Sequence, residues 1–62
     1  MKIGAILETI RGLAASQGFY GRLYQNLMEV KKEDPERWSL VCHELESQNF
    51  RDPVDMVLYF ET

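Results

Sequence analysis

Apolar residues recur every three or four positions along the first part of the chain, with polar residues between them. From about position 2 to 16, the apolar positions are Ile3, Ile6, Leu7, Ile10, Leu13 and Ala14. Residues spaced in this way fall on one face of a helix that turns by about 100° per residue. Glu8, Thr9 and Arg11 fall on the other side. The pattern predicts a first amphipathic helix over 2–16.

Two glycines bear on this first helix. Gly12 lies inside it, at a cost of about 1 kcal/mol relative to alanine. It therefore marks a close approach of two helices or is simply tolerated. Gly18 follows the helix and suits the left-handed backbone that ends many helices. We expect the first helix to end at Gly18.

The segment over 19–32 is the richest in apolar and aromatic side chains. One stripe consists of Phe19, Leu23, Leu27 and Val30, with Tyr20 beside it and with Tyr24 and Met28 on its flank. This apolar surface is wider than one neighbouring helix would cover. We therefore expect this segment to be the central helix of a small bundle.

Two Asp-Pro pairs predict the starts of two further helices. Asp34-Pro35 and Asp52-Pro53 each place a good N-cap residue before a proline at the first helical position. Asp55 follows Asp52 by three residues and could complete a capping box. The resulting helices cover 35–48 and 53–61.

The faces of these two helices follow from the same periodicity. The helix over 35–48 buries Trp38, Val41, Cys42 and Leu45, whereas Leu40 points the other way and Asn49 marks the end. The face of the last helix consists of Val54, Val57 and Leu58, with Phe60 near its edge.

The stretch 56–61 also has the composition of a strand. A lone strand would have no pairing partner in this chain, so we favour a helix. The predicted fold class is all-α, a single domain over 1–62 made of four short helices.

Composition narrows the function classes. The chain of 62 residues has a net charge of −3, which disfavours nucleic-acid binding without excluding it. Its single cysteine, Cys42, allows no internal disulfide and fits a reducing compartment. The longest purely apolar run, Met56–Phe60, is far too short to cross a membrane. We expect a cytoplasmic protein without a membrane partner.

The residues offer little for catalysis. Cys42 and His43 are adjacent and therefore point about 100° apart on a helix, which is poor geometry for a nucleophile and its base. His43 and Glu46 do not complete a zinc site, which needs three or four ligands. No phosphate-binding loop is present. We expect no enzyme activity, no cofactor and no metal, and a role for Cys42 or His43 stays open.

One alternative is a helix-turn-helix-like DNA-binding regulator that uses residues 13–27. The small residues and Gly18 have the spacing of such a turn, and the second helix presents polar side chains able to contact bases. The predicted DNA-binding residues are Arg11, Arg22, Gln25 and Asn26. The shortage of basic residues, and the absence of a helix before the motif, weaken this alternative.

The other alternative is protein binding, because the chain has more large apolar groups than four short helices need. The surplus comprises Tyr20, Tyr24, Met28, Leu40, Tyr59 and Trp38. Aromatic residues and methionine are enriched at interfaces. The same residues could instead cover the edges of a thin core, and a homodimer would also explain them.

Two motifs carry a family resemblance. The chain reads I-R-G-L-A-x-S-Q-G-F-Y-G-R-L over 10–23 and Q-N-F-x-D-P-V-D over 48–55. It resembles short uncharacterised proteins encoded in phages and mobile elements of Gram-positive gut bacteria. The resemblance implies an accessory role, regulatory or anti-host, and assigns no functional residue.

The most distinctive part of these motifs, Ser16–Arg22, coincides with the corner between the first two helices. We therefore place the candidate site there and on the surplus apolar residues. The predicted protein-binding residues are Gln17, Tyr20, Arg22, Tyr24, Met28 and Leu40. The leading hypothesis is a small non-enzymatic protein-interaction module, an adaptor or modulator of phage or mobile-element origin.

Overall fold

The structure, a computed structural model, describes all 62 residues. It contains four helices and no strand. The helices are α1 (Ile3–Ala14), α2 (Gly18–Glu33), α3 (Pro35–Ser47) and α4 (Pro53–Glu61). The predicted all-α bundle is confirmed, and the ambiguous stretch 56–61 is helical. None of the four helices combines the length and apolar character that crossing a bilayer requires.

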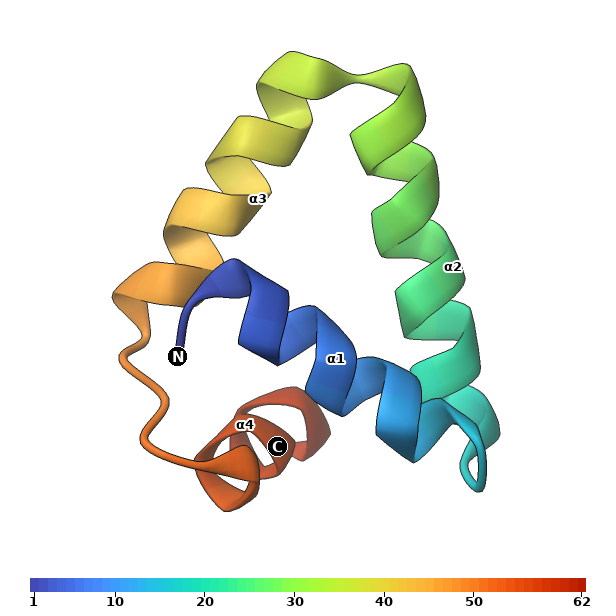
Figure 1. The fold of residues 1–62 in the computed structure, drawn as a ribbon, viewed down its shortest axis with the longest axis vertical. Helices are drawn as coiled ribbons and strands as arrows, with labels where there is room; N and C mark the ends of the chain where they lie inside the picture. The colour runs from blue at the N-terminus through green and yellow to red at the C-terminus, as the bar shows by residue number, and fades with distance from the viewer.

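Figure 1 shows α1, α2 and α3 as three sides of a triangle, with α4 below α1 in this view. The three longer helices contact one another in every pairing. Two of the four completely buried side chains, Ile6 and Ile10, belong to α1, whereas α2 supplies only Tyr20. The contacts of α2 with both α1 and α3 agree with the predicted central position of this helix. The core is nevertheless shared, because α1 supplies more of the completely buried side chains than α2 does.

Seven side chains form the core, and every helix contributes at least one: Ile6, Ile10, Tyr20, Leu27, Leu45, Phe50 and Met56. The inward face of α4 differs from the predicted one, since Met56 is completely buried while Val54 and Leu58 are exposed. Apolar residues surround this nine-residue helix, so periodicity could not select its inner face. Phe50, in the connection before α4, was not predicted as core.

The two Asp-Pro starts are confirmed. An oxygen of Asp34 accepts from the backbone N–H of Arg37 at 3.1 Å, and an oxygen of Asp52 accepts from that of Asp55 at 3.0 Å. Asp55 does not complete the expected capping box, because its carboxylate accepts from the backbone and guanidinium of Arg51, both at 3.0 Å. Asn49 ends α3 with a φ of 55°, in the left-handed region that asparagine tolerates.

The expectations for the two glycines have different outcomes. No glycine has a positive φ, and Gly18 is the first residue of α2, so the predicted left-handed end of α1 is wrong. The N–H groups of Ser16 and Gln17 instead both donate to the carbonyl of Leu13 and close the last turn. A Cβ added at Gly12 would meet nothing within 4 Å, so this glycine does not mark a close helix approach.

The beginning of α1 is held by the far end of α3. Lys2, at the N-cap position, provides no side-chain cap. The backbone N–H of Ile3 instead donates to Glu46 Oε2 at 2.8 Å, and the Met1 amino group donates to the Phe50 carbonyl oxygen at 2.7 Å. A carboxylate near a helix N-terminus also interacts favourably with the helix dipole. Glu46 therefore caps a helix other than its own.

Replacing Glu46 by alanine should lower the free energy of unfolding by about 1 kcal/mol, the usual effect of losing a helix cap. Hydrogen exchange at the first-turn amides of α1 should accelerate, because Ile3 loses its acceptor. Glu29→Ala is the matched control, since Glu29 is exposed on α2 and makes no ion pair. Equal effects of the two substitutions would contradict the capping role.

Candidate functional site

The structure divides the six predicted protein-binding residues among four places. Tyr20 lies in the core, whereas Gln17 and Arg22 are exposed near the corner between α1 and α2. Tyr24 and Met28 line a groove on α2. Leu40 lies in a different groove, over α3. The structure therefore does not join all six residues in one surface.

Tyr20 is completely buried, which corrects the prediction that it belongs to the surplus surface. Its hydroxyl donates to Glu61 Oε2 at 2.7 Å, and its ring meets that of Phe19 edge to face at 5.0 Å. Phe19, expected in the stripe, is 45% exposed instead. Phe19 and Tyr20 both lie at the edge of the apolar stripe of α2, so periodicity does not choose between them. A buried tyrosine needs an acceptor for its hydroxyl. Periodicity cannot reveal that Glu61, 41 residues away, supplies it.

This environment raises the pKa of the Tyr20 phenol to about 12. Burial is the largest cause, followed by the hydrogen bond to Glu61 and the negative charge of that carboxylate. Burial penalises a phenolate because its charge would be poorly solvated, and Glu61 penalises it because two negative charges would lie close together. Tyr20 is therefore a neutral structural donor.

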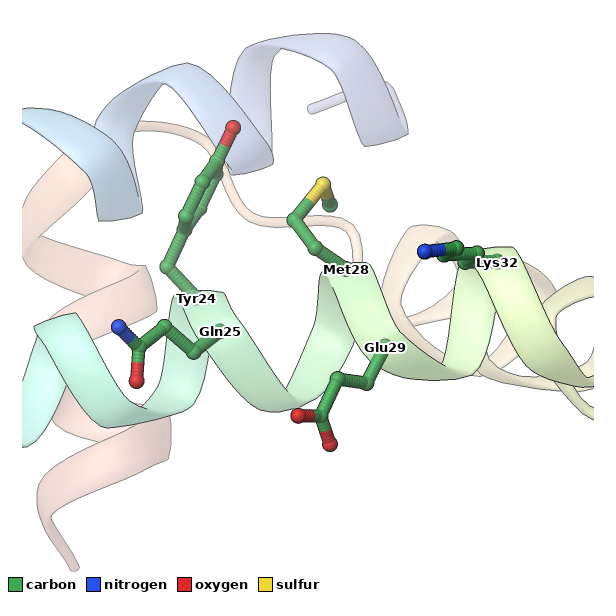
Figure 2. A pocket seen from close by; sticks show the side chains of 5 residues that line it. All are labelled: Tyr24, Gln25, Met28, Glu29 and Lys32. Carbon is green, nitrogen blue, oxygen red and sulfur yellow. The ribbon is translucent and has the colours of Figure 1, made fainter.

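The groove on α2 is the surface that best matches the predicted protein-binding site. It is lined by Tyr24, Gln25, Met28, Glu29 and Lys32. Figure 2 shows Tyr24 and Met28 projecting from the same side of the helix, with Gln25 and Glu29 on the adjoining side. Tyr24 and Met28 are half-buried and pack against the core, while the three polar residues are exposed. An apolar floor with a polar rim is the usual composition of a protein interface.

A second groove opens over α3. Its lining consists of Leu27, Arg37, Leu40, Val41, His43, Glu44, Leu45 and Phe60. Leu40 is 71% exposed, in agreement with the prediction that it points away from the core. The sequence did not predict that Phe60 lines the same groove as Leu40, because the two residues come from helices whose packing no local pattern specifies.

Three of the four predicted DNA-binding residues are exposed on α2: Arg22, Gln25 and Asn26. Helical spacing places Glu29 and Glu33 on the same outward face, where their carboxylates would repel phosphates. The fourth residue, Arg11, lies 3.6 Å from Glu8 in an exposed ion pair. The local charge therefore disfavours the DNA-binding alternative, which stays a prediction.

The surroundings of Cys42 do not favour a nucleophilic thiolate. Burial raises the pKa of the Cys42 thiol, and the Glu46 carboxylate raises it further. A raised pKa reduces the fraction of thiolate, the nucleophilic form. His43 is exposed on α3, and the structure brings together no three His, Cys, Asp or Glu side chains able to hold a metal ion.

The sequence matches no protein-family model, and no curated protein or solved structure is detectably similar to the chain. The function must therefore be inferred from the surfaces of the four helices.

The Tyr20→Phe substitution tests the hydrogen bond between Tyr20 and Glu61. It should lower the free energy of unfolding by about 1 kcal/mol at neutral pH, because the bond to Glu61 is lost while the ring stays buried. The folded state keeps the Tyr20 proton up to a pKa of about 12, whereas an unfolded tyrosine releases it at about 10. Raising the pH through this window therefore favours unfolding of the wild type.

The advantage of the wild type over Tyr20→Phe should thus be fully present below about pH 10, and it should be lost and then reversed as the pH rises toward about 12. The reversal is expected because a shift of this size is worth about 2.7 kcal/mol, more than the hydrogen bond itself. Urea unfolding of both proteins at a series of pH values measures it. Because the two chains share all other titrating groups, their difference isolates Tyr20. A difference that does not change with pH would contradict the assignment.

Proposed function

We propose that the protein is a small non-enzymatic protein-interaction module, an adaptor or modulator that binds a protein partner through α2. The observation that carries this proposal is the α2 groove, where Tyr24 and Met28 form a half-buried floor inside a polar rim.

The chemistry of the groove suits a protein ligand. Tyrosine provides a large contact area with a polar tip, and methionine adapts its shape to irregular surfaces. The rim carries a carboxylate, Glu29, and an ammonium group, Lys32, so it matches a partner with polar groups of both signs. Arg22 and Gln17 continue this exposed polar surface toward the α1–α2 corner.

The family resemblance adds the biological setting of the proposal. An accessory protein of a phage or mobile element acts on its host, so we expect the partner to be a protein of a Gram-positive bacterial cell. The raised pKa of the half-buried Cys42 thiol supports a non-enzymatic role, because the chain's only thiol is poorly suited to nucleophilic attack.

The double substitution Arg22→Ala with Tyr24→Ala tests the proposal. It should weaken partner binding by about tenfold or more, the effect of removing interface hot-spot residues, while helicity by circular dichroism is retained. Binding is measured by capture from a host lysate with immobilised protein, followed by titration of the captured partner. Leu58→Ala, an exposed apolar truncation on α4, is the matched control and should leave binding unchanged.

Nuclease and salt distinguish the two alternatives. A protein partner should remain bound after nuclease treatment and depend weakly on salt, because apolar contacts are little screened. DNA affinity would instead fall steeply with ionic strength. Binding that survives the double substitution, or that requires nucleic acid, would overturn the proposed function.

A further inference from the structure

The outward face of α3 carries charges in a pattern that is complementary to its own reverse. Arg37 lies three residues before Leu40, and Glu44 lies three residues after Val41. The two charges are therefore equidistant from the point midway between Leu40 and Val41. Helical spacing places Arg37 and Glu44 on the same side of α3, one on either side of this apolar centre.

These groups are free to meet a partner. The ion pairs in the structure are Glu8–Arg11 and Arg51–Asp55, and neither includes Arg37 or Glu44. Glu44 accepts only one side-chain hydrogen bond, from the exposed amide of Gln48 at 3.1 Å. Leu40, between the two charges, is the most exposed large apolar side chain of the chain.

The surface beside Leu40 is an apolar groove. Leu27 from α2, Val41 and Leu45 from α3, and Phe60 from α4 contribute its hydrophobic lining. Arg37 and Glu44 line the same groove. A protruding leucine therefore lies next to a hollow of matching chemistry, between two unpaired charges of opposite sign.

We infer that this face of α3 binds a second copy of the chain. The two α3 helices would run antiparallel about a two-fold axis that passes between Leu40 and Val41. Arg37 of each copy then faces Glu44 of the other, and Leu40 of each copy packs against Val41 and the groove of the other. A two-fold interface requires such a self-complementary surface, since every contact occurs twice. A parallel pairing would place like charges together.

Dimer formation would also compensate for the small core of the monomer. Seven buried side chains are a small core for 62 residues, and association would cover further apolar surface. The α2 groove shares no lining residue with the α3 groove. The dimer therefore goes beyond the proposed function, and either inference can fail without the other.

Charge reversal tests this arrangement by sedimentation equilibrium. Arg37→Glu alone places two pairs of like negative charges in the dimer, and Glu44→Arg alone places two pairs of like positive charges. Each should raise the dimer dissociation constant by about tenfold or more. The double substitution R37E/E44R should restore association, and so should mixing the two single variants, because their charges are again opposite across the interface.

Two controls separate pairing from other effects. Ser39→Glu changes the charge of α3 on the side opposite Arg37 and Glu44, outside the lining of the groove, and should leave the dissociation constant unchanged. Glu44→Arg makes the net charge of the chain less negative, so a general relief of repulsion would strengthen association rather than weaken it. Far-UV circular dichroism should show unchanged helicity, because all three positions are exposed.

Any one of three results would overturn the inference. They are a wild-type chain that remains monomeric up to about 1 mM, a Glu44→Arg variant that dimerises as well as the wild type, or a mixture of the single variants that does not associate. Occupation of the groove by a different protein in a monomeric wild type would also reject it.

Discussion

The fold depends most on the enclosure of Tyr20. This side chain is the largest of the four that are completely buried, and its hydroxyl is bound to Glu61 at the other end of the chain. The bond connects the first turn of α2 to the last turn of α4. A ring placed in this way provides apolar contact with the core and a directional polar link, which few other residues could combine. Met56 of α4 and Phe50, in the connection before α4, belong to the same core.

Two further hydrogen bonds also join parts of the chain that are far apart in the sequence. The Ile3 N–H group binds Glu46, and the Met1 amino group binds the Phe50 carbonyl, so both connect the beginning of the chain to the end of α3 or the loop beyond it. In a domain with a thin core, such long-range hydrogen bonds fix the relative positions of helices that apolar packing alone specifies weakly. The same thin core leaves two apolar grooves open, one on α2 and one over α3.

Local features of the sequence predicted the helices well. The two Asp-Pro pairs and Asn49 mark helix ends through short-range backbone chemistry, and the structure shows each of them in that role. The choice between Phe19 and Tyr20, and the inner face of α4, depend instead on residues far away in the chain. Glu61 accepts from Tyr20, and Met56 rather than Val54 or Leu58 faces the core.

The candidate site also has features that local sequence predicts and features that depend on tertiary packing. Periodicity correctly set Leu40 apart from the core and Tyr24 and Met28 on the flank of α2. It could not show that Leu40 and Phe60 line one groove, or that Tyr20 is enclosed, because both facts depend on how α4 packs. Grooves between helices follow from tertiary packing, which a helical pattern constrains only one helix at a time.

The most direct test of the account is a pH titration of the tyrosine ring carbons by NMR, with the Tyr20 signal assigned by comparison with Tyr20→Phe. Circular dichroism at each pH establishes that the chain is still folded. If Tyr20 is enclosed, its signal keeps its neutral position until the pH approaches about 12. A midpoint at about pH 10 in the folded protein, the value of a solvated tyrosine, would contradict the enclosure of this ring.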